Sequence, residues 1–101
     1  MTVKERFDSI IAENNGIITA GKMMLLIEEL AEKRIYDEIP YGVGLLMNFQ
    51  DGKDVQRAYD KIVDRAITNK DFDIAEKYNV MITDDESREW WTEIIEEKKS
   101  E

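Results

Sequence analysis

The stretch that decides the fold is Thr19–Tyr36, with the sequence TAGKMMLLIEELAEKRIY. Its centre, Met23–Ile27, is a run of five apolar residues, and a helix that is apolar around most of its circumference must be covered on several sides. Thr19 is placed to cap the N-terminus, and Ile18 before it occupies the position of a hydrophobic staple. The stretch therefore predicts a central, buried helix around which the rest of the chain packs.

A second helix is predicted before this stretch. Thr2 and Glu5 have the spacing of a capping box, and the apolar residues of the segment form one helical stripe, Val3, Phe7, Ile10 and Ile11. Asn15 or Gly16 is expected to end this helix in a left-handed conformation. Because the connection is short, we expect the two helices to be neighbours. We find no internal repeat in the sequence.

The segment Ile39–Gln50 allows two interpretations. Its alternating apolar residues are typical of a strand, namely Tyr41, Val43, Leu45, Met47 and Phe49. Pro40, however, suits the first turn of a helix, and the only candidate partner strands, Ile17–Ile18 and Val80–Ile82, are short. We predict a short helix here. The alternative is an α+β fold with a minimal sheet, similar to a winged helix.

The clearest helix signal is Asp54–Thr68, where apolar residues recur for three turns at helical spacing. Asp51 or Asp54 is expected to cap this helix, and Asn69 to end it. Asp71 can cap a further short helix that reaches Tyr78.

The last predicted helix follows a linker, Val80–Ile82, that is expected to bury its apolar residues. Thr83 and Glu86 repeat the capping-box spacing, and the apolar stripe of the helix consists of Trp90, Trp91, Ile94 and Ile95. The predicted fold is all-α, a compact bundle of five or six short helices in one domain, residues 1–101, with the last few residues frayed.

The composition excludes several classes of site. The 101 residues carry a net charge of −9 and include neither histidine nor cysteine, which removes imidazole catalysis, disulfides and thiolate metal sites. No apolar run is long enough to cross a membrane, and the N-terminal segment has no signal-peptide pattern. We therefore expect a cytoplasmic protein, without cofactors, that does not bind membranes.

No residue pattern predicts catalysis or metal binding. Lys22 is interpreted as a solvent-facing lysine in the first turn of its helix. Each remaining candidate has a plain structural interpretation: solvated faces for Glu28/Glu32 and Glu89/Glu93, helix starts for Asp51–Asp54 and Asp71–Asp73, and backbone crowding or flexibility after Pro40 for Gly42–Gly44.

Nucleic-acid binding has one supporting resemblance. The residues Asn15–Thr19, which lead into a helix, resemble the opening of some winged helix-turn-helix domains. Such a domain requires a basic recognition helix, whereas Asp54–Thr68 balances its bases with aspartates. With a charge of −9 the chain also repels phosphate, so we expect no direct contact with nucleic acid.

The acidic C-terminal region carries the functional hypothesis. Asp84–Glu101 contains eight acidic and three basic residues, and it includes two adjacent tryptophans. Neighbouring positions on a helix point about 100° apart, so one indole can pack inward while the other lies at the surface. Carboxylates around an aromatic anchor suit a basic partner. The predicted partner-binding residues are Glu86, Glu89, Trp90, Trp91, Glu93, Glu96 and Glu97.

We therefore expect a non-enzymatic binding protein, an inhibitor or immunity protein that occupies the nucleic-acid-binding surface of a larger basic protein. Phage counter-defence proteins and toxin immunity proteins are similar in size and charge. The first alternative is a structural protein that forms homodimers through the apolar residues of Met23–Ile27 and Val43–Phe49. The second is a DNA-binding regulator of helix-turn-helix type.

Overall fold

A computed structural model describes residues 1–48 and 53–101. These residues form six α-helices and one 3₁₀ helix without any strand, so the fold is all-α as predicted and the alternative with a sheet is not needed. The helices are α1 (Val3–Glu13), α2 (Gly16–Glu32), η1 (Tyr36–Glu38), α3 (Ile39–Leu46), α4 (Lys53–Thr68), α5 (Phe72–Asn79) and α6 (Asp85–Lys99).

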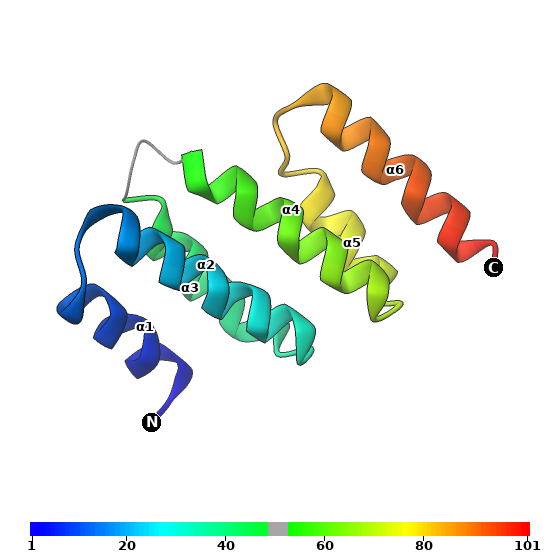
Figure 1. Ribbon diagram of the computed structural model, residues 1–101. Coiled ribbons are helices and arrows are strands. Elements are labelled where there is room, and N and C mark those ends of the chain that lie inside the picture. The colour runs from blue at the N-terminus through cyan, green and yellow to red at the C-terminus, as the bar shows by residue number, and fades with distance from the viewer. Residues whose placement is uncertain (49–52) are drawn as a thin grey trace.

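The helices form a flattened stack with two layers (Figure 1). In one layer α2, α4 and α6 run side by side in the same direction, and α3 and α5 lie behind them. The outer edge of α2 is covered by α1. Because α2 packs against α1, α3 and α4, it is the central helix that its apolar run predicts.

The predicted bounds of the central helix are wrong at both ends. It begins at Gly16, one turn earlier than predicted, so Thr19 lies inside the helix, 1% exposed, and does not cap it. Ile18 is 60% exposed and forms no hydrophobic staple. The earlier start is possible because Gly16 adopts a left-handed φ of +55° and the chain turns directly from α1 into α2. The sequence predicts this conformation for a residue that ends α1, but Gly16 begins α2, and the residue that caps the end of α1 is Asn14 in an extended conformation.

At its C-terminus α2 ends in a Schellman turn. The N–H of Ile35 donates to the carbonyl of Leu30 (2.8 Å), and the N–H of Arg34 donates to the carbonyl of Ala31 (3.1 Å). Arg34 has a φ of 64°. This left-handed residue reverses the chain, which explains why the helix stops before Tyr36.

The same turn recurs at the end of α4. The N–H of Asp71 donates to Ala66 (2.8 Å), the N–H of Lys70 donates to Ile67 (2.9 Å), and Lys70 also has a φ of 64°. Each of these positions lies 36 residues after its counterpart in the first turn.

Buried positions repeat at this offset as well. They are the pairs Thr19/Val55, Met23/Tyr59, Leu26/Ile62, Ile27/Val63, Leu30/Ala66, Ala31/Ile67, Ile39/Ala75, Gly42/Tyr78, Val43/Asn79 and Leu46/Ile82. The expectation of no internal repeat is therefore wrong. Over residues 16–46 only Gly16/Gly52 and Asp37/Asp73 are identical at this offset, so the repeat is one of structure with almost no sequence identity.

Helix α3 confirms the helical interpretation of its segment, although it ends at Leu46 and residues 49–52 lie outside the described part. Pro40 occupies its first turn. Gly42 lies against the ring of Phe7, where an added Cβ would be 2.3 Å from Cζ. The crowding predicted at this glycine is therefore real, and it lets α1 approach α3 closely.

A polar junction links two helix pairs, α2–α3 and α4–α5. Asp71 precedes α5 but makes no capping bond; it accepts hydrogen bonds from Arg34 (Nε, 2.8 Å; Nη2, 2.7 Å) and from the Tyr36 hydroxyl (2.5 Å). Asn69 donates to the Tyr36 hydroxyl (3.0 Å). The hydroxyl and then the guanidinium lower the pKa of Asp71. The capping role predicted for Asp71 is wrong because its carboxylate binds groups from the first pair.

Candidate functional site

The connection before α6 differs from its prediction in two respects. Val80 and Met81 are 73% and 40% exposed, and only Ile82 is buried. The cap of α6 is Asp84, one residue later than predicted, whose Oδ2 accepts hydrogen bonds from the N–H and hydroxyl of Ser87 (2.9 and 2.7 Å). Thr83 is not free to start the helix because its backbone N–H donates to a residue of α4.

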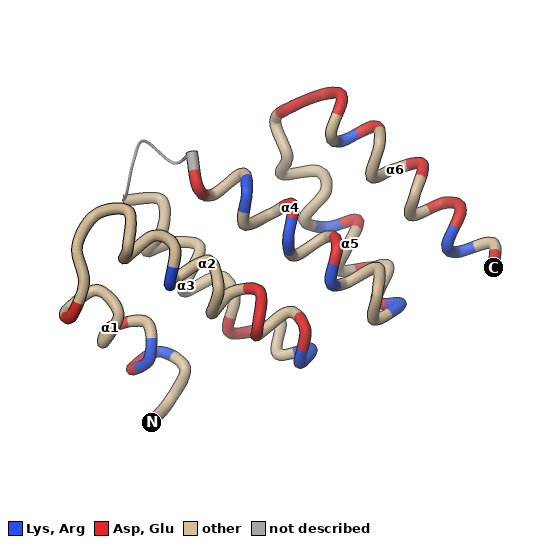
Figure 2. The backbone as a smooth tube through the Cα atoms, in the orientation of Figure 1, with Lys and Arg blue, Asp and Glu red and all other residues tan. Residues whose placement is uncertain are grey.

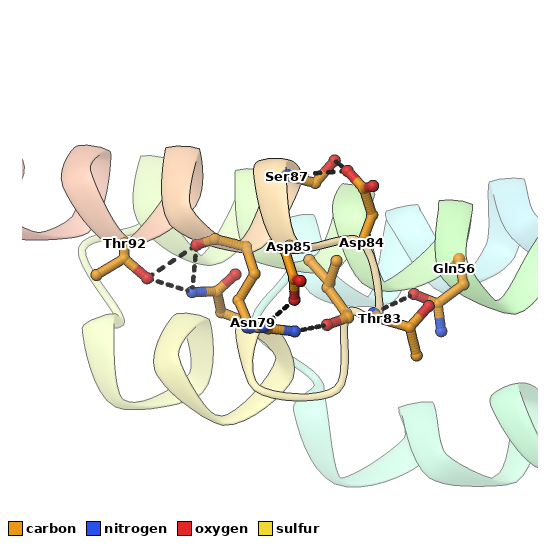
Figure 3. Close-up of polar contacts among 9 residues, drawn as sticks. Gln56, Asn79, Thr83, Asp84, Asp85, Ser87 and Thr92 are labelled. Carbon is orange, nitrogen blue, oxygen red and sulfur yellow. Dashed lines mark hydrogen bonds and ion pairs between the residues drawn. The ribbon is translucent and has the colours of Figure 1, made fainter.

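Asn79 and Arg88 fix the rotation of α6 about its axis (Figure 3). The buried Asn79 amide donates to the Arg88 carbonyl (3.2 Å) and the Thr92 hydroxyl (3.0 Å). In turn, the Arg88 guanidinium donates to the carbonyl of Ile82 (2.8 Å). These contacts hold one side of α6 against α5 and leave the opposite side outward.

Gln56 anchors the connection to α4. Its Oε1 accepts a hydrogen bond from the N–H of Thr83 (2.9 Å), and its amide donates to the carbonyl of Met81 (3.4 Å). Sequence reasoning missed Gln56, Asn79 and Arg88. Each is a polar residue on a helix that makes hydrogen bonds to another element, and Arg88 also pairs with Asp85 of its own helix. No local pattern reveals the bonds to the other element.

The two tryptophans separate as predicted. Trp91 is 6% exposed and donates its indole N–H to Asp60 of α4 (2.5 Å), whereas Trp90 is 54% exposed. Their rings meet edge to face with centroids 4.6 Å apart. Trp91 therefore anchors α6 to the core, and it supports a large apolar surface that Trp90 presents to solvent.

Five carboxylates occupy the outward side of α6, and we call them the acidic face: Glu86, Glu89, Glu93, Glu96 and Glu97. All five side chains are exposed, and none forms an ion pair or a hydrogen bond with a residue in the described ranges. Figure 2 shows acidic residues recurring along α6 from its start to its end. The structure thus brings six of the seven predicted residues to the surface and places Trp91 beneath them.

The acidic residues of α2 behave differently. Glu28 pairs with Arg65 (2.8 Å) and Lys61 (3.1 Å) of α4, and Glu29 pairs with Arg6 of α1 (2.8 Å). These partners lower the pKa of both carboxyl groups. The interpretation of Glu28 as a solvated side chain is therefore wrong, because α4 places two cations against it.

Other candidate sites remain structural. Lys22 is exposed and donates to the Asn14 side chain (3.0 Å). Across residues 1–48 and 53–101, no cluster of acidic side chains is arranged to hold a metal ion, and no helix combines the length and apolarity needed to cross a membrane. Of the segment Asp51–Asp54, which the sequence predicts to be a helix start, residues 51 and 52 lie outside the described part of the chain.

Comparisons with protein-family models, curated proteins and solved structures found no match for this chain.

Proposed function

We propose that this chain is a small, non-enzymatic inhibitor that binds a larger basic protein through the acidic face of α6. The observation that carries the proposal is the set of five exposed carboxylates without an ion-pair partner in the described part of the chain. Glu28 and Glu29 of α2, by contrast, join helices through ion pairs. Unpaired charges of one sign contribute little to folding, but they accelerate association with an oppositely charged surface.

The charge spacing supports a nucleic-acid-binding surface as the target. Glu86 and Glu97 are eleven residues apart, which corresponds to about 16 Å along a helix. Five negative charges over this length give roughly one per 4 Å, whereas one strand of DNA carries one per about 3.4 Å. A groove that binds phosphates would therefore meet a similar charge density on α6.

Trp90 supplies the apolar part of the surface. Interfaces obtain most of their binding energy from a few buried aromatic or arginine residues surrounded by polar groups. With 54% of its surface exposed and carboxylates on its own helix face, Trp90 fits the role of anchor.

The basic residues Lys61 and Arg65, which a DNA-binding α4 would need, are held by Glu28.

We place the protein in the cytoplasm because its sequence lacks cysteine.

Self-association is the second candidate, and only some residues of the predicted surface, Leu25 and Met47 among them, are exposed to take part in it. Met23, Leu26 and Ile27 are buried, but Ile17 and Leu25 of α2 are 78% and 67% exposed. A dimer formed through these apolar residues would persist at high salt, whereas binding through the acidic face would weaken.

The test is affinity capture from the source cells at graded salt, followed by kinetics with the captured partner. We expect Glu89→Lys with Glu93→Lys to fold normally and to associate roughly tenfold or more slowly at low salt. The matched control, Glu13→Lys with Glu32→Lys, changes the net charge equally at two exposed residues away from α6 and should retain most of the rate. If the α6 variant associates with the partner at the wild-type rate, the acidic face serves only to keep the protein soluble. The binding site would then be sought around Tyr36–Phe49.

A further inference from the structure

A groove lies beside Trp90, between the C-terminal halves of α4 and α6 and the start of α5. It has a volume of about 650 Å³, which is within the range of sites that hold a ligand or a peptide side chain. Its apolar lining consists of Ile67, Phe72, Trp90, Trp91 and Ile94. The groove therefore continues the apolar surface of Trp90 into the body of the protein.

The repeat explains why this groove is open. In the preceding gap, between α2 and α4, Glu28 bridges the two helices by binding Arg65 and a lysine of α4. Asp64 is the counterpart of Glu28, 36 residues later, but within the described residues it forms no ion pair. Lys98 of α6, which lines the same groove, pairs instead with the C-terminal residue, Glu101 (3.4 Å). Within the described residues, therefore, no ion pair closes the gap between α4 and α6, which the hydrogen bond from Trp91 to Asp60 crosses.

Charges of both signs flank the groove. Glu86 and Glu93 lie one turn from Trp90 along α6, on the acidic face and outside the groove lining. The lining itself carries Lys70, Lys98 and Lys99 together with Asp64 and Glu101. Lys98 pairs with Glu101 and Lys99 pairs with Glu76, whereas Lys70 has no ion-pair partner among the described residues. A segment that crosses α6 from the acidic face into the groove therefore meets carboxylates first, then apolar side chains, then the ammonium group of Lys70.

We propose that the groove receives a segment of the basic partner that has cationic, apolar and anionic residues in that order. The cations lie against Glu86 and Glu93, an aliphatic or aromatic side chain enters beside Trp90, and a carboxylate reaches Lys70. This inference rests on the proposed function and adds to it the composition of the recognised segment. A segment that contains only basic residues would bind the acidic face, but it would place positive charges against the ammonium group of Lys70.

Peptides of defined sequence test the proposal. An extended chain advances about 3.3 Å per residue, so an octapeptide of two lysines, Ser-Leu-Leu-Ser and two glutamates spans the groove. The controls replace the leucines with serines or the glutamates with lysines. Binding is followed by nuclear magnetic resonance of the two indole N–H groups, because Trp91 is hydrogen bonded to Asp60 and Trp90 faces solvent.

We expect the leucine- and glutamate-containing peptide to shift the Trp90 indole signal and to bind roughly tenfold more tightly than either control. Lys70→Glu should remove this advantage and favour the control peptide in which lysines replace the two glutamates. An unchanged Trp91 signal verifies that the variant is folded. The proposal is overturned if the three peptides bind equally, or if the shifts spread over the acidic face without affecting Trp90.

The two proposals fail in different ways. If Glu89→Lys with Glu93→Lys leaves capture of the cellular partner intact, the proposed function is wrong whatever the peptides do. If that variant loses the partner while Lys70→Glu and Trp90→Ala both retain wild-type capture, the acidic face is the site and the groove is not.

Discussion

The two helix pairs, α2–α3 and α4–α5, have the same backbone arrangement, but different side chains occupy the space at equivalent buried positions. In the first pair Gly42 leaves a space that the Phe7 ring of α1 occupies. At the equivalent position of the second pair, the Tyr78 ring contacts the Tyr59 ring of its own pair, with centroids 5.9 Å apart. The architecture therefore depends on the turn and on which positions are buried, while the volume at each position can come from different elements.

The gaps between successive helices differ in the same way. Glu28 bridges the first gap with two ion pairs. Asp64 forms no ion pair within the described residues, and the second gap, which the hydrogen bond from Trp91 to Asp60 crosses, contains the groove beside Trp90. A single plan thus produces one gap that ion pairs close and one that contains a groove. Because short stacks need contacts between neighbouring units, each unit should depend on the other.

The strongest test of this dependence is a buried charge in either pair. Met23 and Ile62 are fully buried, and an unpaired carboxylate there costs several kcal/mol, comparable with the whole stability of a small domain. We expect Met23→Asp and Ile62→Asp each to unfold both pairs, with loss of the helical circular dichroism signal. A variant that kept half of the signal in a cooperative transition would show that the pairs fold independently.

The difference in side-chain packing between the two pairs can be tested at Gly42. We expect Gly42→Ala to lower the free energy of unfolding by about 1–3 kcal/mol, since the new methyl group overlaps the Phe7 ring. Gly44 is the matched control in the same helix, where a Cβ meets nothing within 4 Å, and Gly44→Ala should stabilise by about 0.5–1 kcal/mol. Phe7→Leu should recover part of the Gly42→Ala loss; strictly additive effects in thermal unfolding would argue against direct contact.

Local signals predicted the elements well. The Thr2–Glu5 capping box forms as expected, the apolar run gives the central helix, and Trp90 and Trp91 separate because adjacent positions diverge by about 100°. These features depend on residues within one or two turns of each other. The exposure of the acidic face follows from the same periodicity, whereas its role in binding stays a prediction.

Long-range features were not predictable in this way. The pairing of Glu28 with Arg65 and of Asp71 with Arg34 joins residues 37 positions apart, and no local pattern selects either partner. The repeat was hidden because buried positions accept different side chains, as at Gly42 and Tyr78. The groove beside Trp90 depends on how α4, α5 and α6 meet, which periodicity along one helix does not specify.

The equivalent turns also differ in a titratable residue. Asp71 occupies the position that Ile35 holds in the first pair, and Tyr36 and Arg34 hold its pKa below the ordinary 3.8. A lowered pKa in the folded state contributes stability above the unfolded pKa, and this contribution is lost as the pH falls through the folded value. We expect Asp71→Asn to be less stable than wild type at neutral pH and to show a shallower loss below about pH 4.

Thermal unfolding at a series of pH values checks this prediction. Glu28→Gln is the comparison, because partners also lower the pKa of Glu28, and it should flatten the acid slope in the same direction. An Asp71→Asn profile parallel to that of wild type would show that the carboxylate contributes nothing that depends on its ionisation.

The smallest effect concerns the two turns. Arg34 and Lys70 both adopt a φ of 64°, a conformation that costs a residue with a Cβ about 1 kcal/mol relative to glycine. Lys70 has no ion-pair partner among the described residues, so Lys70→Gly should stabilise the fold by up to about 1 kcal/mol. Arg34→Gly relieves the same backbone strain but also removes both hydrogen bonds to Asp71, so its gain should be smaller or reversed. Equal shifts in the denaturation midpoints would mean that the Arg34–Asp71 contact adds no stability, and that the two turns are energetically as alike as their backbones.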